Sequence, residues 1–112
     1  MAMLFQGQLS GTASAIVTVG ATEKIQVKTF LLYNNGSADI DVFFHFVPNA
    51  FGALGTADNT NRVSLTVPGR KFIEVSPSYP IEYNSENDAV FASAQTASMI
   101  NCFVMGLRID LS

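Results

Sequence analysis

The side chains of this 112-residue chain that could perform chemistry are few, and none stands in a catalytic pattern. His45, the only histidine, lies between Phe44 and Phe46 with no nucleophile at a motif spacing, whereas a general base needs a partner and a pocket. Cys102, the only cysteine, lies in an apolar stretch, whereas reactive cysteines occupy electropositive, partly exposed sites. We therefore interpret both as packing residues and predict that the protein is not an enzyme.

Metal binding has two weak candidates in the sequence. Zinc needs three or four His, Cys or carboxylate ligands, which one histidine and one cysteine do not supply. Asp39 and Asp41 would lie on one side of a strand, about 7 Å apart, and with Asn34 or Asn35 could offer the oxygen ligands that calcium prefers. The acidic stretch 84–88 offers a similar set. Neither has the ligand order of an EF-hand loop, so we predict solvated turn carboxylates, with no metal and no cofactor.

The composition indicates a protein-binding surface. Apolar residues make up 48% of the chain and charged residues only 13%, against about 25% charged in average soluble domains. A domain of this size cannot hide so much apolar surface alone, so we expect part of it to be covered by other subunits. Among the six basic residues only Arg70 and Lys71 are adjacent, which argues against nucleic acid. No apolar run reaches the ~18 residues of a membrane span, and the N-terminus lacks the features of a signal peptide.

The hydrophobic pattern predicts a single all-β domain over residues 1–112. Period-two alternation and β-branched or aromatic runs recur along the chain, whereas helical periodicity is nearly absent. The predicted strands cover residues 4–9, 15–19, 24–33, 39–47, 62–67, 71–75, 81–83, 89–94 and 99–111. Asn34-Asn35-Gly36-Ser37 predicts a hairpin between two of them, Pro68-Gly69 predicts a second hairpin, and 48–61 is a long loop. This spacing favours an antiparallel β-sandwich of jelly-roll type with about eight strands.

Side chains alternate between the two faces of a strand, and three predicted strands, 24–33, 39–47 and 99–111, are apolar on both faces over part of their length. In the last strand, the face that we assign to the core carries Phe103, Met105, Leu107, Ile109 and Leu111. Its opposite face starts with Ile100, Cys102 and Val104 and turns polar only at Arg108 and Asp110. In strand 39–47, the face assigned to the core carries Ile40, Val42, Phe44 and Phe46.

The apolar residues on the opposite faces are our candidate protein interface. They are Phe43, His45, Val47, Ile100, Cys102 and Val104. A monomeric sandwich should keep its outer faces polar, and a contiguous exposed apolar patch usually marks an interaction site. Alternatively, loops of the same chain, particularly 48–61, could cover these faces.

The order of features along the chain is similar to that of a known class of proteins. Two strands flank the turn Asn34-Asn35-Gly36-Ser37, and a later strand ends in Val67-Pro68-Gly69-Arg70. The polar turn 84–88 leads into Val90-Phe91-Ala92-Ser93-Ala94, and the chain closes with an apolar strand at 101–109. This arrangement resembles the small β-sandwich structural proteins of tailed bacteriophages, in particular those that decorate or cement the capsid.

The resemblance covers about residues 16–110, with Asn87-Asp88 in place of the family's Gly-Asp turn and a longer loop at 48–61. It implies a virion structural protein that is made in the host cytoplasm and lies on the outer capsid surface. Its partners would be the major capsid protein and further copies of itself, as a dimer or trimer.

Two other functions stay open at this point. A carbohydrate- or receptor-binding sandwich would stack sugar rings on exposed aromatic side chains, and the chain has no tryptophan. The tyrosine candidates for such a site are Tyr33, Tyr79 and Tyr83. The third possibility is a small tail or neck component of the same virion.

Overall fold

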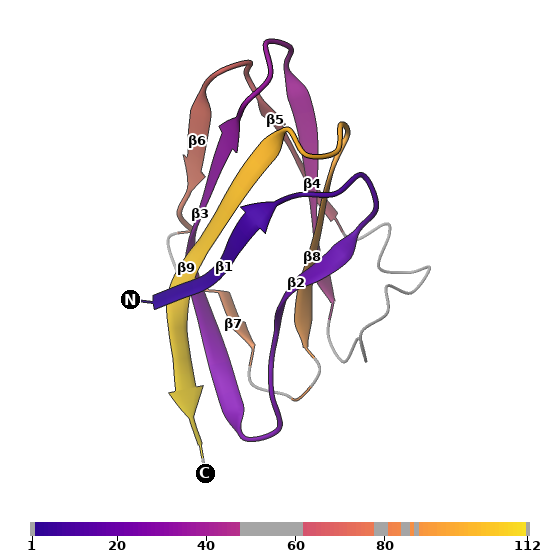
Figure 1. Cartoon of the computed structure of the whole chain (residues 1–112). Helices are drawn as coiled ribbons and strands as arrows, with labels where there is room; N and C mark the ends of the chain where they lie inside the picture. The colour runs from indigo at the N-terminus through magenta and orange to yellow at the C-terminus, as the bar shows by residue number, and fades with distance from the viewer. Residues whose placement is uncertain (1, 48–61, 78–80, 84–85, 87, 112) are drawn as a thin grey trace.

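The strand-forming segments build two antiparallel sheets that pack face to face (Figure 1). The computed structural model describes residues 2–47, 62–77, 81–83, 86 and 88–111. In this part of the chain there are nine strands and no helix. The strands are β1 (Ala2–Gln8), β2 (Ser14–Thr18), β3 (Glu23–Asn34), β4 (Ile40–Val47), β5 (Arg62–Val67), β6 (Phe72–Val75), β7 (Ile81–Tyr83), β8 (Ala89–Ala94) and β9 (Ile100–Asp110). They coincide with the predicted strands to within about two residues at most ends.

The strand order is that of the predicted jelly roll. One sheet, called sheet A here, has the order β1-β9-β3-β6, with β7 also paired to β3; sheet B has the order β2-β8-β4-β5. The first strand therefore pairs with the last, the second with β8, the third with β6 and β7, and β4 with β5. Because β6 and β7 pair with successive parts of β3, they take the place of one interrupted strand. The prediction of about eight strands in a β-sandwich is confirmed.

The two predicted hairpins are wrong. The Asn-Gly turn joins β3 in sheet A to β4 in sheet B, and Pro68-Gly69 joins β5 to β6, again between sheets. The apolar faces of β3 and β4 bury each other across the sandwich, where Phe30 and Phe44 lie with ring centroids 4.7 Å apart. Face-to-face packing removes more apolar surface from water than edge pairing would, so the turn becomes a crossover between layers.

The two crossovers lie side by side and are bonded to each other. Arg70 N–H donates to Gly36 O over 2.9 Å. Gly69 N–H donates to Asp39 Oδ1 over 3.1 Å. A Cβ added at Gly69 would lie 2.2 Å from the carbonyl oxygen of Ser37, so only glycine permits this close approach.

The core lies between the sheets, and it corrects the predicted orientation of the last strand. Ile100, Cys102 and Val104 are fully buried in the main hydrophobic cluster, whereas Phe103 and Met105 are half-buried on the outside of sheet A. The polar residues that guided the assignment, Arg108 and Asp110, lie near the exposed end of β9. These two residues are polar because they lie at the end of the sandwich, so their polarity does not show which face of β9 points outward. The prediction for β4 is confirmed: Ile40, Val42 and Phe44 are buried in the core, and Phe46 packs against it.

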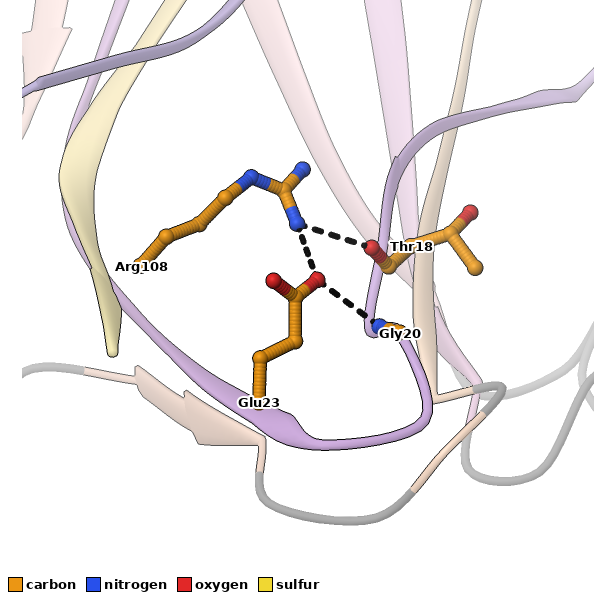
Figure 2. A network of polar contacts seen from close by, with 4 residues as sticks. All are labelled: Thr18, Gly20, Glu23 and Arg108. Carbon is orange, nitrogen blue, oxygen red and sulfur yellow. Dashed lines mark hydrogen bonds and ion pairs between the residues drawn. The ribbon is translucent and has the colours of Figure 1, made fainter. Parts of the chain in front are cut away.

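Arg108 closes the lower end of the sandwich by joining the two sheets (Figure 2). Its guanidinium Nη1 donates to Thr18 O of β2 and to Glu23 Oε1 at the start of β3. The same carboxylate oxygen accepts a hydrogen bond from Gly20 N–H over 2.8 Å. The network therefore fixes the turn between β2 and β3 and gives Arg108 a structural role.

Candidate functional site

Exposed and half-buried apolar side chains lie together on the outer face of sheet A. They come from four strands: Met3, Tyr33 and Phe72 are exposed, and Leu31, Phe103 and Met105 are half-buried. We call these six residues the sheet-A stripe. Phe72 is 64% exposed and Met3 49%. Phe103 and Met105 lie between core-facing neighbours on β9, so alternation directs them outward. An exposed patch of this kind marks an interaction site more often than a scattered apolar surface does.

Strand register makes these residues one continuous diagonal band. Phe72 of β6 pairs with Tyr33 of β3. Two residues further along β3, Leu31 pairs with Phe103 of β9. Two residues further along β9, Met105 pairs with Met3 of β1. The stripe thus crosses sheet A from its β6 edge to its β1 edge, and Leu107 and Ile109 extend the apolar surface along β9.

The two sides of the stripe differ in charge. Towards the start of β9 lie the neutral amides Gln6, Gln8 and Asn101. They line a shallow hollow of about 210 Å³ together with Gly7 and Phe103.

The charged side chains of this face lie on the opposite flank. They are Lys24, Lys28, Glu74 and Glu82. Lys24 Nζ and Glu82 Oε1 form an ion pair at 3.7 Å. The stripe itself contains no formal charge, which is the composition typical of the centre of a protein interface.

The interface residues predicted from sequence do not form this surface. Ile100, Cys102 and Val104 are fully buried between the sheets, so their assignment to an interface is wrong. The face of β4 that carries Phe43, His45 and Val47 is indeed the outer face of sheet B. The physical reason for the error on β9 is that alternation relates neighbouring side chains to each other but does not say which face is inside.

On sheet B, most of the predicted interface is already covered within one chain. His45 is 2% exposed and Val47 1%, and Val47 forms a small second cluster with Ala89 and Phe91. Phe43 lies under the guanidinium of Arg62, whose Cζ is 4.6 Å from the ring centroid. This surface is therefore not available to a second subunit in the way that we predicted. The segment 48–61, proposed above as a cover, lies outside the described residues.

The sequence carries a signal for this candidate surface but does not show on which side of the strand it lies. Phe103 and Met105 belong to one apolar face of the last strand, which alternation alone assigns to the core. No local pattern in the sequence relates Met3, Tyr33 or Phe72 to that face. Only the strand register shows that these residues lie next to one another.

Neither His45 nor Cys102 is placed for catalysis at this surface. Burial raises the pKa of the Cys102 thiol to about 12, because the thiolate cannot be solvated between the sheets. A thiol in this state is a poor nucleophile and a poor metal ligand. His45 lies between Phe91 of β8 and Arg62 of β5 across the ladder, away from sheet A.

The carboxylates proposed as calcium ligands are engaged in hydrogen bonds. Asp39 Oδ1 accepts from Gly69 N–H, and Asp41 Oδ1 accepts from the Thr66 hydroxyl over 2.7 Å. The Asn34 side chain is buried and bonded to the backbone. Of the second candidate, residues 84, 85 and 87 lie outside the described residues. Within the described ranges, no group of three or more His, Cys, Asp or Glu is positioned to hold a metal ion.

A second hollow, of about 460 Å³, lies between the β3–β4 and β8–β9 connections. Asp39, Gln95, Thr96 and Met99 are among its lining residues, and the described lining contains no aromatic ring on which a sugar could stack. Nor do the described residues include a helix long and apolar enough to cross a membrane.

No protein-family model matches this chain, and no curated protein matches it. Its function is therefore inferred from the fold and from the chemistry of its surfaces.

Proposed function

We propose that this protein is a non-enzymatic virion component, a capsid decoration or cement protein that binds and stabilises neighbouring major capsid subunits on the outer capsid surface. The observation that carries the proposal is the sheet-A stripe, an uncharged band of exposed and half-buried Phe, Tyr, Leu and Met side chains across four strands. Aromatic residues and Met are enriched at protein interfaces and charges are depleted from their centres. A surface of this composition recognises protein in preference to a phosphate or a metal ion.

The fold and the sequence resemblance direct the choice of partner. Jelly rolls serve as viral capsid domains and as lectins, and a fold alone does not decide between such functions. The resemblance to phage decoration proteins favours the capsid. Burial of the stripe contributes about 25 cal/mol for each Å² of apolar surface removed from water, less the cost of association. Repetition over a shell adds avidity to each individually weak contact.

The test is co-sedimentation with shells assembled from the major capsid protein of the phage that would encode this chain. We expect saturable binding at a fixed ratio to coat subunits. Phe72→Glu should weaken binding at least about tenfold, because a carboxylate enters an apolar contact. Val63→Glu is the matched control: Val63 is 46% exposed but lies on β5 of sheet B, so its binding should equal that of the wild type.

Four results would oppose this proposal. Wild-type protein that does not bind shells, or equal binding by both variants, contradicts it directly. Binding to isolated tails or necks in place of shells would favour the tail-component alternative. Glycan binding without shell binding would favour the carbohydrate-binding alternative.

A further inference from the structure

We propose that the sheet-A stripe is the contact between two copies of this chain, which pack the outer faces of sheet A against each other about a two-fold axis. The inference deepens the proposed function, on which it rests for treating the stripe as a protein-binding surface. In the protein free of the capsid a second copy covers the stripe, and on the shell the coat subunits take the place of that copy. A two-fold contact uses the same patch on both subunits, so the patch must be complementary to itself. The stripe meets this requirement in extent, in shape and in charge.

The extent of sheet A matches what a stable dimer needs. Four strands spaced ~4.8 Å apart and a central strand rising ~3.4 Å per residue give a face of roughly 600–700 Å² in projection. Because side chains protrude from the sheet, the accessible area of the face is larger than this projected area. A standard interface buries about 800 Å² on each partner, so a sheet-on-sheet contact over this face reaches the required size. The apolar stripe occupies the middle of the face and would be its dry centre.

The outer face of sheet A has a shape that suits contact with another sheet. The hollow beside Phe103 holds only about 210 Å³ and is bordered mainly by glutamine, asparagine and glycine, whereas pockets for small ligands usually enclose 300–1,000 Å³ of mostly apolar lining. Outside this hollow the side chains of the stripe stand on neighbouring strands of one sheet. Two such faces pack about 10 Å apart, as in the core of a sandwich.

The charges select the direction of the axis. An axis along the stripe superposes the two stripes and places the amide flank of one copy over the charged flank of the other. Asn101 then lies over the partner's Glu74, and Gln6 over the partner's Lys28. An axis at right angles to the stripe, in the plane of the contact, also superposes the two stripes but reverses their direction, so Glu74 of one copy lies over the partner's Lys28. Opposite charges brought together at an interface favour association, and the axis along the stripe leaves the same two charges over neutral amides. The axis at right angles to the stripe is therefore the one that the register and the charges support.

The oligomeric state of the purified chain, with no capsid protein present, tests the inference separately from the proposed function. Sedimentation velocity and light scattering from about 1 to about 100 µM should show a dimer with a dissociation constant within that range. Phe72→Glu, at a side chain 64% exposed in the monomer, should raise this constant at least about tenfold without loss of the folded state. Val63→Glu should dimerise like the wild type, and Tyr33→Glu provides a second stripe variant if Phe72→Glu fails to fold.

Cross-linking tests the axis. Because Cys102 is fully buried, a short bismaleimide should join only cysteines introduced on the surface. An equimolar mixture of Glu74→Cys and Lys28→Cys chains should give more cross-linked dimer than either variant alone. A wild-type monomer throughout the concentration range, or a dimer that both stripe variants leave unchanged, would overturn the inference. Equal cross-linking in the single variants and in the mixture would overturn the assigned axis. Shell binding by a strictly monomeric protein would overturn the dimer and leave the proposed function standing.

Discussion

Asn34 and Cys102 show how single polar side chains are used inside this protein. The Asn34 side-chain amide donates to Ala38 O over 2.8 Å and to Val67 O over 3.0 Å, and its Oδ1 accepts from Gly36 N–H over 2.8 Å. These bonds hold the β3–β4 crossover against the end of β5 and compensate the burial of the amide. Cys102 is buried among apolar residues and behaves as a small hydrophobic side chain. At the residue scale, burial therefore gives the Asn34 amide and the Cys102 thiol structural roles.

The first prediction concerns stability at alkaline pH. The pKa of the Cys102 thiol rises from its ordinary 9.0 to about 12 in the folded protein. Between these pH values the unfolded chain has released the proton and the folded chain retains it. The unfolded state then binds fewer protons, so the free energy of unfolding falls as the pH rises. The slope from this group is at most about 1.4 kcal/mol per pH unit.

Urea unfolding of the wild type and of Cys102→Ala from pH 8 to 11 measures this effect. At pH 8, where the thiol is protonated in the folded and in the unfolded state, the variant should be about 1 kcal/mol less stable than the wild type through the cavity it creates. Its stability should also fall less steeply with pH than that of the wild type. Parallel pH profiles would show that Cys102 does not contribute.

At the scale of the elements, β3 and β9 approach more closely than a side chain would allow. Gly106 pairs with Val27 next to a bulge in their ladder. A Cβ at Gly106 would lie 1.9 Å from the carbonyl oxygen of Gln26. That oxygen belongs to the backbone of a central strand and cannot move without disturbing the sheet that carries the stripe. Gly106 is therefore required by the close contact of two strands.

We predict that Gly106→Ala lowers the free energy of unfolding by about 3 kcal/mol, since relieving the overlap shifts backbone in a packed sheet. Gly11→Ala is the control, because its added Cβ would meet nothing nearer than Ala97 Cβ at 3.9 Å. The control should change stability by no more than about 0.5 kcal/mol. Chemical denaturation of both variants makes the comparison, and similar losses in the two would contradict the role given to Gly106.

At the scale of the whole molecule, the jelly roll joins the two ends of the chain. β9 lies between β1 and β3, so the last strand completes the centre of sheet A. It also supplies Ile100, Cys102 and Val104 to the core and two residues to the stripe. The fold and the proposed interface therefore both depend on the same C-terminal strand. Such long-range pairing incurs the full entropy of loop closure before it gains stability.

We predict that a chain ending at Met99 does not fold. Loss of β9 removes the ladders to β1 and β3 and opens the core, while the other strands have no replacement partner in sheet A. Circular dichroism and urea titration of the truncated chain should show no cooperative unfolding transition. A chain ending at Asp110, which keeps all of β9, should unfold cooperatively like the wild type. Cooperative unfolding of the shorter chain would contradict this dependence.

The sequence alone determined where the strands lie and that the fold is an antiparallel sandwich. These properties depend on local alternation and on turn residues, which act over a few neighbouring positions. Alternation was also sufficient for β4, because Asp39 and Asp41 mark the outer side next to the core residues Ile40, Val42 and Phe44. The jelly-roll type followed from the number and spacing of the strands.

Only the tertiary structure decided which strands pair and which face of β9 is inside. The Asn-Gly turn is compatible locally with a hairpin and with a crossover, and burial of Phe30 against Phe44 selects the crossover. On β9 both faces are apolar, so no local rule separates Cys102 from Phe103. The inner face is determined by the partners of β9, which come from the opposite end of the chain and from β3. The stripe likewise exists only through register, because the residues that form it are brought together by hydrogen bonds between strands distant in sequence.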